Sequence, residues 1–345
     1  MKGMFFLGAD KENKFEMREM DLSELGAHDV LVKNMACGIC GTDVHIYHGG
    51  EGSAKVEPPV VLGHEFSGIV EAVGSEVTTV RVGDHITCDP NKYCGICRPC
   101  RMGKKQNCEH LYAVGVNANG GFAQYSRFYE GQVFKIDDSV DFDVAAMTEP
   151  LACVIHGIDL AAIKPGQNVA VIGTGAIGFL MMQMAKLEGA GKVIMCATSD
   201  EKCKMALEMG ADYAINSKKD NLKEKIKEIT GCDGVDVAIE CVGKIPAVRQ
   251  AFDIAGLGCK MLIFSVPDPG AKIELDLFDV FKKELCITGS IINPDTHQRA
   301  VNMINSGKLN IKRLITHTFP LSGVEDAIHM QMSKESIKVV VHPQE

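Results

Sequence analysis

The stretch that decides the fold reads Asn168-Val169-Ala170-Val171-Ile172-Gly173-Thr174-Gly175-Ala176-Ile177-Gly178. It begins as an apolar strand and ends as the pattern G-x-G-x-x-G, directly before a helix expected over 179–187. In that context the pattern is typical of a dinucleotide-binding turn. Glycines let the backbone approach a pyrophosphate, and the helix N-terminus offers free N–H groups. The sequence therefore predicts cofactor contacts at Gly173, Gly175, Ala176, Ile177 and Gly178, with a ligand-free tight turn as the alternative.

The sequence around this turn alternates strands with helices. Between about 153 and 290 we expect strands at 168–173, 193–197, 236–241 and 260–266, and helices that include 200–209 and 221–230. Alternation at this spacing predicts βαβ units and a doubly wound parallel sheet, the Rossmann arrangement. Residues 1 to about 150 have short apolar alternations between Gly and Pro, typical of a β-rich domain. The last 50 residues predict helices near 297–306 and 324–333 and a strand at 337–341.

The tip of the second expected strand bears on the choice of cofactor. An acid at that tip would accept hydrogen bonds from the ribose hydroxyls and repel a 2′-phosphate. The chain has Ala197 there, followed by Thr198, Ser199 and Asp200, which we expect in the first turn of the next helix. Thr198 and Ser199 could hydrogen-bond a phosphate, and Lys202 or Lys204 could add charge. These residues favour NADP over NAD.

Four of the fourteen cysteines fall within 15 residues, at Cys94, Cys97, Cys100 and Cys108. Four thiolates on one short loop can close a tetrahedral zinc site that leaves no position for a substrate, so the site would be structural. Four unliganded thiols and a nucleic-acid-binding zinc ribbon are the alternatives.

Further candidate ligands are spread over the chain. They occur in Cys37-Gly38-Ile39-Cys40-Gly41-Thr42-Asp43-Val44-His45, in Gly63-His64-Glu65 and in Glu149-Pro150-Leu151. Each segment offers a ligand suited to zinc. Spacing alone does not indicate that the three segments converge.

These motifs, in this order, resemble those of the zinc-dependent medium-chain alcohol dehydrogenases along essentially the whole chain. Within that family, the segment from Cys40 to Tyr47 is similar to the threonine dehydrogenases, and Glu149-Pro150-Leu151 with His156-Gly157 resembles the polyol, sorbitol-like branch. The resemblance implies a GroES-like β-rich catalytic domain over 1–152 and 291–345, with a structural zinc lobe at 88–110. It implies a Rossmann dinucleotide-binding domain over 153–290.

The resemblance also assigns roles to residues. Cys40 and His64 match ligands of a catalytic zinc, and Glu149 stands where ethanol-type members have a second cysteine. Glu65 matches an acid that binds the metal or lies just behind it. Thr42 matches the hydroxyl that touches the substrate alcohol, and His45 matches a proton-relay residue near it, a surface or cofactor contact being the alternative for His45. We expect one glutamate to contact the metal directly, because two would make the site formally −1 and weaken the Lewis acid.

The expected function is reversible oxidation of a secondary alcohol to a ketone, with two zinc ions per chain and NADP or NAD. A zinc ion lowers the pKa of a bound hydroxyl, the proton leaves through Thr42 towards His45, and the cofactor takes the hydride. A polyol or sugar alcohol is the first choice of substrate, and a simple secondary alcohol, a diol or L-threonine are alternatives. A zinc-free quinone or enoyl reductase and a non-catalytic zinc- and nucleotide-binding protein on the same fold are the rival classes.

Composition limits the other classes of function. The 345 residues carry a net charge of −9, which disfavours nucleic acid as a partner. The uncharged run 165–185 is interrupted by glycines and Pro165, so we expect no membrane span. The N-terminus predicts no export signal, so we expect a cytoplasmic protein with reduced thiols. By resemblance alone we expect a homo-oligomer, either a dimer or a tetramer.

Overall fold

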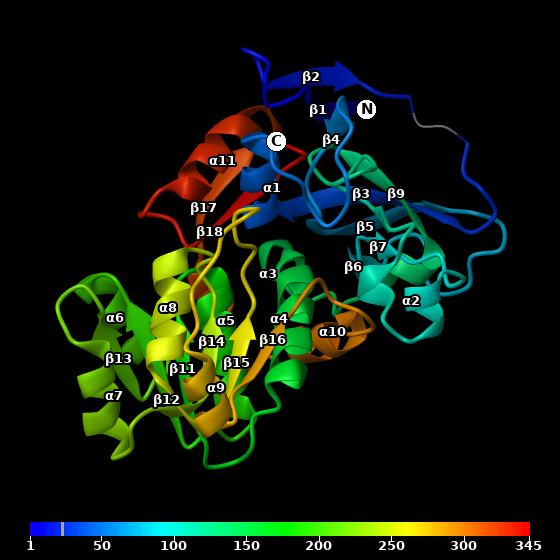
Figure 1. Ribbon diagram of the computed structural model, residues 1–345. Helices are drawn as coiled ribbons and strands as arrows, with labels where there is room; N and C mark the ends of the chain where they lie inside the picture. Colours follow the sequence, from blue (N-terminus) through cyan, green and yellow to red (C-terminus); the bar gives the residue numbers. More distant parts are fainter. Residues whose placement is uncertain (22–23) are drawn as a thin grey trace. The chain divides into compact units, whose positions relative to one another are not determined.

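The chain forms two units in the computed structural model, which describes residues 1–21 and 24–345 (Figure 1). The first unit comprises 1–152 and 292–345, and the second comprises 153–291. Each unit is built on its own main sheet.

The second unit contains a six-stranded parallel sheet with the order β13-β12-β11-β14-β15-β16. Numbered along the chain within the unit, this order is 3-2-1-4-5-6, the Rossmann order. The predicted doubly wound parallel sheet is thereby confirmed. The strands are β11 (Asn168–Ile172), β12 (Lys192–Ala197), β13 (Tyr213–Asn216), β14 (Val235–Glu240), β15 (Ala255–Ile263) and β16 (Cys286–Gly289).

The helices of this unit connect those strands and lie against the sheet (Figure 1). They are α5 (Ala176–Leu187), α6 (Asp200–Glu208), α7 (Leu222–Thr230), α8 (Ile245–Asp253) and α9 (Leu277–Lys283). The expected strand at 260–266 differs most from the structure, since β15 starts at Ala255 and ends at Ile263. Beyond that end, the Ser265 hydroxyl donates to the Glu240 carboxylate, which ties the chain to the end of β14.

The first unit is β-rich, as predicted, and its largest sheet has the order β10-β6-β5-β3-β18-β17, with β9 paired to β3. A three-stranded sheet, β2-β1-β4, and the pair β7-β8 complete it. The strands are β1 (Lys2–Phe6), β2 (Phe15–Glu19), β3 (Asp29–Gly38), β4 (Val60–Val61), β5 (Glu65–Val73), β6 (His85–Cys88), β7 (Asn91–Lys92), β8 (Tyr112–Ala113), β9 (Tyr125–Tyr129), β10 (Val133–Lys135), β17 (Ile315–Pro320) and β18 (Lys338–His342).

The helices outside the second unit are short, apart from α4, which contains the boundary between the units. They are α1 (Gly41–Tyr47), α2 (Arg98–Arg101), α3 (Phe142–Ala146), α4 (Thr148–Ala161), α10 (His297–Asn305) and α11 (Val324–Met332). Single 3-10 turns lie at Lys105–Asn107, Glu130–Gln132, Lys312–Leu314 and Leu321–Gly323. Over the described residues, no helix combines the length and apolar character that crossing a bilayer requires.

Each unit has its own apolar core. In the first, Phe66 and Phe128 pack with ring centroids 4.8 Å apart, within a cluster that also includes side chains of β18 and α11. In the second, apolar side chains of the parallel strands pack against α7 and α8. The first core fixes β3, β5 and β18 relative to one another, and Cys40, His64 and Glu65 lie at the ends of β3 and β5.

Candidate active site and metal centres

The register between β3 and β5 brings together candidate ligands that are distant in sequence. Gly38, the last residue of β3, pairs with Glu65, the first residue of β5. Cys40 follows β3 by two residues and His64 directly precedes β5, so the two side chains meet at the same end of the sheet. One ligand atom from each of Cys40, His64 and Glu65 lies within 4.8 Å of the others. Thiolate, imidazole and carboxylate together form a donor set that suits zinc.

Two positions beside this cluster have no room for a side chain and are occupied by glycine. A Cβ on Gly38 would lie 2.3 Å from Glu65 Oε2 and 2.8 Å from Lys338 Cε. Gly63 has φ of +90°, and a Cβ there would lie 2.8 Å from Cys37 Sγ. Cys37 itself is fully buried.

A buried carboxylate lies behind the candidate histidine. Asp43 is fully buried, and its Oδ2 accepts a hydrogen bond from the Cys40 backbone N–H at 2.8 Å. Its Oδ1 lies 3.7 Å from His64 Nδ1, and among the described residues neither atom has a hydrogen-bond partner. Because Nδ1 faces Asp43, Nε2 is the nitrogen left for a metal. A carboxylate behind a metal-bound histidine fixes its tautomer and orientation.

The electrostatic surroundings of His64 suit a cation. Burial opposes protonation of the ring, but the charges of Asp43, Cys40 and Glu149 outweigh it and hold the pKa of His64 well above its ordinary value. Burial raises the pKa of Asp43 despite the opposing charge of His64. A metal ion would neutralise the same anions that favour a proton on the ring.

Lys338, at the start of β18, forms a buried ion pair with Glu65. Its ammonium contacts Glu65 Oε2 and donates to the Ile39 carbonyl at 2.8 Å. The exposed fractions of the two side chains are 5% and 2%. Burial lowers the pKa of Lys338, but the charges of Glu65 and Cys40 outweigh that effect and raise it overall. The candidate metal cluster therefore has a fixed positive charge behind its carboxylate.

The remaining expected site residues of this unit lie nearby on two helices. Glu149 is in the first turn of α4, is 5% exposed, and is near enough for its charge to act on His64. Thr42 and His45 are both on α1 and are both partly buried. Three residues apart, they lie on the same side of the helix. A Cβ on Gly52 would lie 3.1 Å from the Thr42 methyl, so the loop at Gly52 packs against Thr42.

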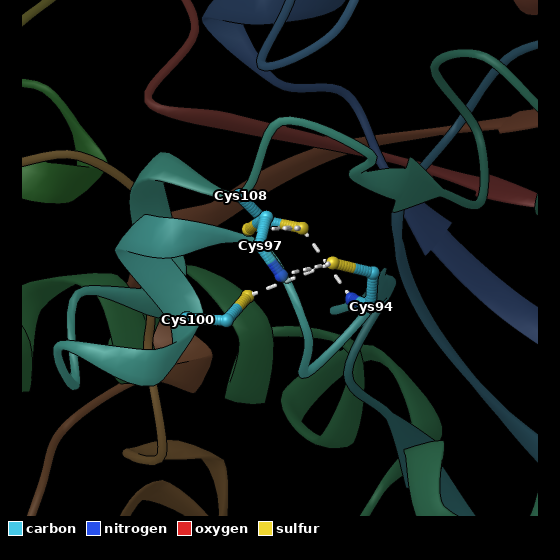
Figure 2. Close-up of side chains that lie close together, drawn as sticks. All are labelled: Cys94, Cys97, Cys100 and Cys108. Atoms are coloured by element: carbon cyan, nitrogen blue, oxygen red, sulfur yellow. Dashed lines mark hydrogen bonds between the residues drawn. The ribbon is translucent and has the colours of Figure 1, made fainter.

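The four cysteines of the lobe converge (Figure 2). The sulfurs of Cys94 and Cys100 are 4.0 Å apart, and those of Cys97 and Cys108 are also 4.0 Å apart. In a tetrahedral site with Zn–S bonds of about 2.3 Å, sulfurs lie about 3.8 Å from one another. All fourteen cysteines of the chain are free thiols. The spacing thus fits a closed four-sulfur zinc site.

Backbone amides favour thiolates in this lobe. The Cys97 N–H donates to Cys94 Sγ at 3.4 Å, and the Cys94 N–H donates to Cys108 Sγ at 3.3 Å. Hydrogen bonds from the amides of Cys97 and Ile96 lower the pKa of Cys94 to about 6. Burial raises the pKa of Cys100 to about 12, a cost that a cation bound to the sulfurs would offset.

The glycine-rich turn joins β11 to α5 with Gly175 as the helix N-cap. Gly173 has φ of +115°, and a Cβ on Gly178 would lie 2.0 Å from the Gly173 carbonyl oxygen. A Cβ on Gly175 would have no neighbour within 4 Å. Gly173 and Gly178 thus keep the turn tight, while Gly175 leaves its outer face open. Ala176 and Ile177, which begin α5, supply the free N–H groups at its N-terminus.

The residue at the tip of β12 is neutral. Ala197 is buried, Thr198 is exposed, and Ser199 caps α6 by accepting a hydrogen bond from the Lys202 N–H at 3.3 Å. Asp200 lies in the first turn of α6, as expected. Its carboxylate accepts from Asn216 Nδ2 at 2.7 Å and pairs with Lys219, and these contacts lower its pKa. Asp200 is therefore held by β13 and the residues that follow it.

Comparison with known proteins adds to this geometry. Residues 26–138 match the family described as the alcohol dehydrogenase GroES-like domain, and residues 176–306 match zinc-binding dehydrogenase. A sorbitol dehydrogenase from Halalkalibacterium halodurans is 36% identical over 95% of this chain and 96% of its own length. The chain belongs to the zinc-binding alcohol dehydrogenase family. It is thus an oxidoreductase that acts on alcohols with a nicotinamide cofactor.

Two further relatives span the same length. An L-threonine 3-dehydrogenase from Bacillus licheniformis is 33% identical over 99% of both chains. A protein from Sinorhizobium meliloti 1021, described as a zinc-binding dehydrogenase bound to NADP, has a crystal structure that matches this one. That match has a TM-score of 0.93 at 38% identity and covers 99% of this chain and 100% of the other.

The sequence did not single out three residues that lie at the candidate sites of this dehydrogenase. Asp43 lies within the quoted Cys40 segment, but its contact with His64 depends on the fold. Lys338 could have been suspected as a lone charge in an apolar strand, Ile337-Lys338-Val339-Val340-Val341. Lys219 follows β13, the strand beside β12. The sequence alone does not indicate that β13 lies next to β12, so the contact of Lys219 with Asp200 could not be predicted.

Proposed function

We propose that this dehydrogenase oxidises a secondary alcohol of a polyol or sugar alcohol to a ketone, with two zinc ions per chain and NADP as the preferred cofactor. The observation that carries the proposal is the cluster of Cys40, His64 and Glu65 beside the helix that bears Thr42. L-threonine and a diol remain the alternative substrates.

In this proposal Cys40, His64 and Glu65 hold the catalytic zinc, and Glu149 lies just behind it or exchanges with a ligand. Bound there, zinc would supply Lewis-acid activation that lowers the pKa of a substrate hydroxyl. With +2 on the metal, Cys40, the two glutamates and the buried Asp43 give a formal charge of −2, and Lys338 reduces it to −1. Lys338 therefore offsets one of the two glutamate charges that would otherwise weaken the Lewis acid.

The protein's own part in the reaction is to orient the alcohol and remove its proton. We propose that the Thr42 hydroxyl accepts the proton from the substrate oxygen while it donates its own towards His45. His45 then releases a proton to solvent. The two residues share a side of α1, which supports a relay along it. Such acid–base assistance is typically worth about 10²–10⁴-fold in rate.

The structural zinc is proposed to be held by Cys94, Cys97, Cys100 and Cys108. Support comes from the two sulfur–sulfur distances of 4.0 Å and from amides that favour thiolates. Because all four positions are protein ligands, this site would contribute folding energy and no chemistry.

For the cofactor, we propose that Gly173, Gly175, Ala176, Ile177 and Gly178 bind the pyrophosphate. Ala197, Thr198, Ser199 and Lys202 would face the ribose and its 2′-phosphate. The preference for NADP is supported by Asp200, whose carboxylate is occupied by Asn216 and Lys219. An acid already paired with an ammonium group repels a phosphate less than a free one does.

The test is a panel of polyols, diols and L-threonine, assayed with NADP and NAD on zinc-loaded enzyme. The proposal expects the highest kcat/KM with a polyol and NADP. Faster turnover of L-threonine would move the substrate assignment to the alternative. Activity on enones or quinones from a zinc-free protein would favour the rival reductase class.

A single-residue test addresses the relay. Thr42→Val should keep both zinc ions and lose most of its turnover, because the path for the proton is cut. A loss below tenfold would remove Thr42 from the relay.

We also propose a cytoplasmic homo-oligomer, a dimer or a tetramer. The edge strand β16 and helix α9 expose several apolar side chains, with Phe281 78% exposed and Phe278 66% exposed. Exposed apolar residues along a sheet edge are common at subunit contacts. Light scattering on the parent and on Phe281→Glu tests this, since a monomeric parent would refute it.

A further inference from the structure

The helix that carries Thr42 and His45 is too short to hold its own position. The helix α1 spans only Gly41–Tyr47, and isolated helices of this length are not stable in water. Its first turn is fixed because Asp43 accepts from the Cys40 N–H at 2.8 Å. The contacts at the C-terminal end of α1 therefore also determine where Thr42 and His45 lie.

That other end is held by Tyr47, which is 8% exposed. Its hydroxyl lies 2.9 Å from Glu325 Oε1 and 2.9 Å from His329 Nε2. Glu325 and His329 are on α11, which lies beside α1 (Figure 1). They are four residues apart and so share one side of that helix, and both side chains reach the Tyr47 hydroxyl. A carboxylate only accepts hydrogen bonds, so the hydroxyl proton goes to Glu325 and His329 Nε2–H donates to the phenol oxygen.

A third contact comes from the N-terminal part of the chain. The Lys14 ammonium donates to the Tyr47 carbonyl at 3.1 Å and lies 4.0 Å from the centroid of its ring. A cation at the last carbonyl of a helix also suits the helix dipole. Tyr47 is therefore contacted by two separate segments at the end of α1, where the following residue, His48, also contacts Met332 of α11.

We propose that Tyr47, Glu325 and His329 form a clamp that positions α1, and that through α1 they set the placement of Thr42 and His45. They are positioning residues, since none of them needs to touch substrate or cofactor. This inference rests on the proposed role of Thr42. Errors of about 1 Å in the placement of reacting groups can cost on the order of 10²-fold in rate. Loss of the clamp should therefore lower kcat, while the free energy of unfolding and the affinity for substrate and cofactor change little.

The test uses the variant Tyr47→Phe, which lacks the hydroxyl group and keeps the ring. We expect kcat to fall about tenfold while KM for the alcohol and for NADP stays within about twofold and zinc content is unchanged. The matched control is Tyr129→Phe, on β9, a tyrosine that is 40% exposed and outside the clamp. Glu325→Leu removes the carboxylate that accepts the hydrogen bond from the Tyr47 hydroxyl. We expect it to lower kcat in the same way. Because both changes break one clamp, the double variant should lose no more than the worse single variant.

A second readout does not depend on turnover. Amide hydrogen exchange of residues 41–48 should be faster in Tyr47→Phe and in Glu325→Leu than in Tyr129→Phe. Unchanged exchange and unchanged kcat in both clamp variants would overturn the proposal. A lower melting temperature with unchanged kcat would also overturn it, since the cluster would then serve stability alone. If the parent oxidises no alcohol, the proposed function fails, and the exchange measurement still decides whether the clamp holds α1.

Discussion

Lys338 and Glu65 form an ion pair that is almost wholly enclosed, in a space that Gly38 leaves by having no side chain. The lysine comes from β18 and the glutamate from β5, and β3 lies between these strands. The pair therefore links the C-terminal strand of the chain to the candidate metal cluster. It also gives that cluster a counter-charge that none of the metal-binding motifs contains.

Removing the lysine should destabilise the protein strongly. In zinc-free protein, Lys338→Met would leave the Glu65 carboxylate buried without its ammonium partner, and breaking a buried pair in this way costs about 3–5 kcal/mol. The double variant Lys338→Met/Glu65→Gln should recover part of this loss, because no uncompensated charge remains. Urea unfolding of the three proteins, each stripped of zinc with a chelator, measures the difference. Equal free energies of unfolding for Lys338→Met and the parent would mean that the ion pair does not contribute to stability.

Enlarging residue 38 should have a related effect. In Gly38→Ala the new methyl group would overlap the carboxylate of Glu65 and the end of the Lys338 side chain. We expect weaker zinc binding at the catalytic site and an unchanged lobe, as measured by metal analysis during titration with a chelator. Gly41→Ala is the matched control, because a Cβ there would meet nothing within 4 Å. Identical metal retention in both variants would contradict the steric argument.

Stability should depend on pH through Asp89, which lies 8% exposed at the base of the lobe. Burial raises the pKa of Asp89 to about 6 despite hydrogen bonds from Asn91. A raised pKa means that the fold favours the protonated form. Asp89 therefore contributes its full stabilisation below the ordinary pKa of an aspartate, and this contribution is lost as the pH rises through about 6. Relative to Asp89→Asn, the parent should lose about 1 kcal/mol between pH 5 and pH 7. A constant difference between the two proteins over this range would show that Asp89 stays ionised.

The cofactor preference should respond to Lys219 and to Ala197. Lys219→Ala frees Asp200 from its ammonium partner, and Ala197→Asp adds an acid at the tip of β12. Both changes should shift the ratio of kcat/KM towards NAD, where about 1.4 kcal/mol corresponds to tenfold. Lys225→Ala is the control, since Lys225 pairs with Glu228 on α7 and has no part in the proposed cofactor site. A parent that already prefers NAD strongly would mean that another residue binds the ribose.

The sequence predicted the fold because its signals are local. Alternating apolar strands and helical segments indicated the parallel sheet, and the glycine-rich turn located its first βα connection. The ends of strands and helices were predicted less accurately. For example, β15 ends at Ile263, and the Ser265 hydroxyl beyond it donates to Glu240. Such a contact depends on the neighbouring strand and has no local signal.

The candidate sites divide in the same way. The lobe could be found from spacing, because its four cysteines lie on one short segment. Cys40 and His64 could be named, but their meeting depends on the pairing of Gly38 with Glu65 across two strands. Lys338 and the partners of Tyr47 come from the far end of the chain, so only the folded structure brings them to the site.

The lobe has its own test. Cys97→Ser should lose one zinc ion and lower the melting temperature, because a structural site contributes folding energy. The purified variant should keep its other zinc ion and bind NADP normally. Full metal content with an unchanged melting temperature would remove the structural site from the account.

The central claim is that Cys40 and His64 hold a catalytic zinc separate from the lobe. The most direct measurement is zinc stoichiometry, NADP affinity and polyol turnover in Cys40→Ser, compared with the parent. We expect two zinc ions per chain in the parent and one in the variant, with NADP affinity retained and turnover lost by at least 10³-fold, on the order of what metal activation of a hydroxyl supplies. Two zinc ions and near-normal turnover in Cys40→Ser would contradict the account.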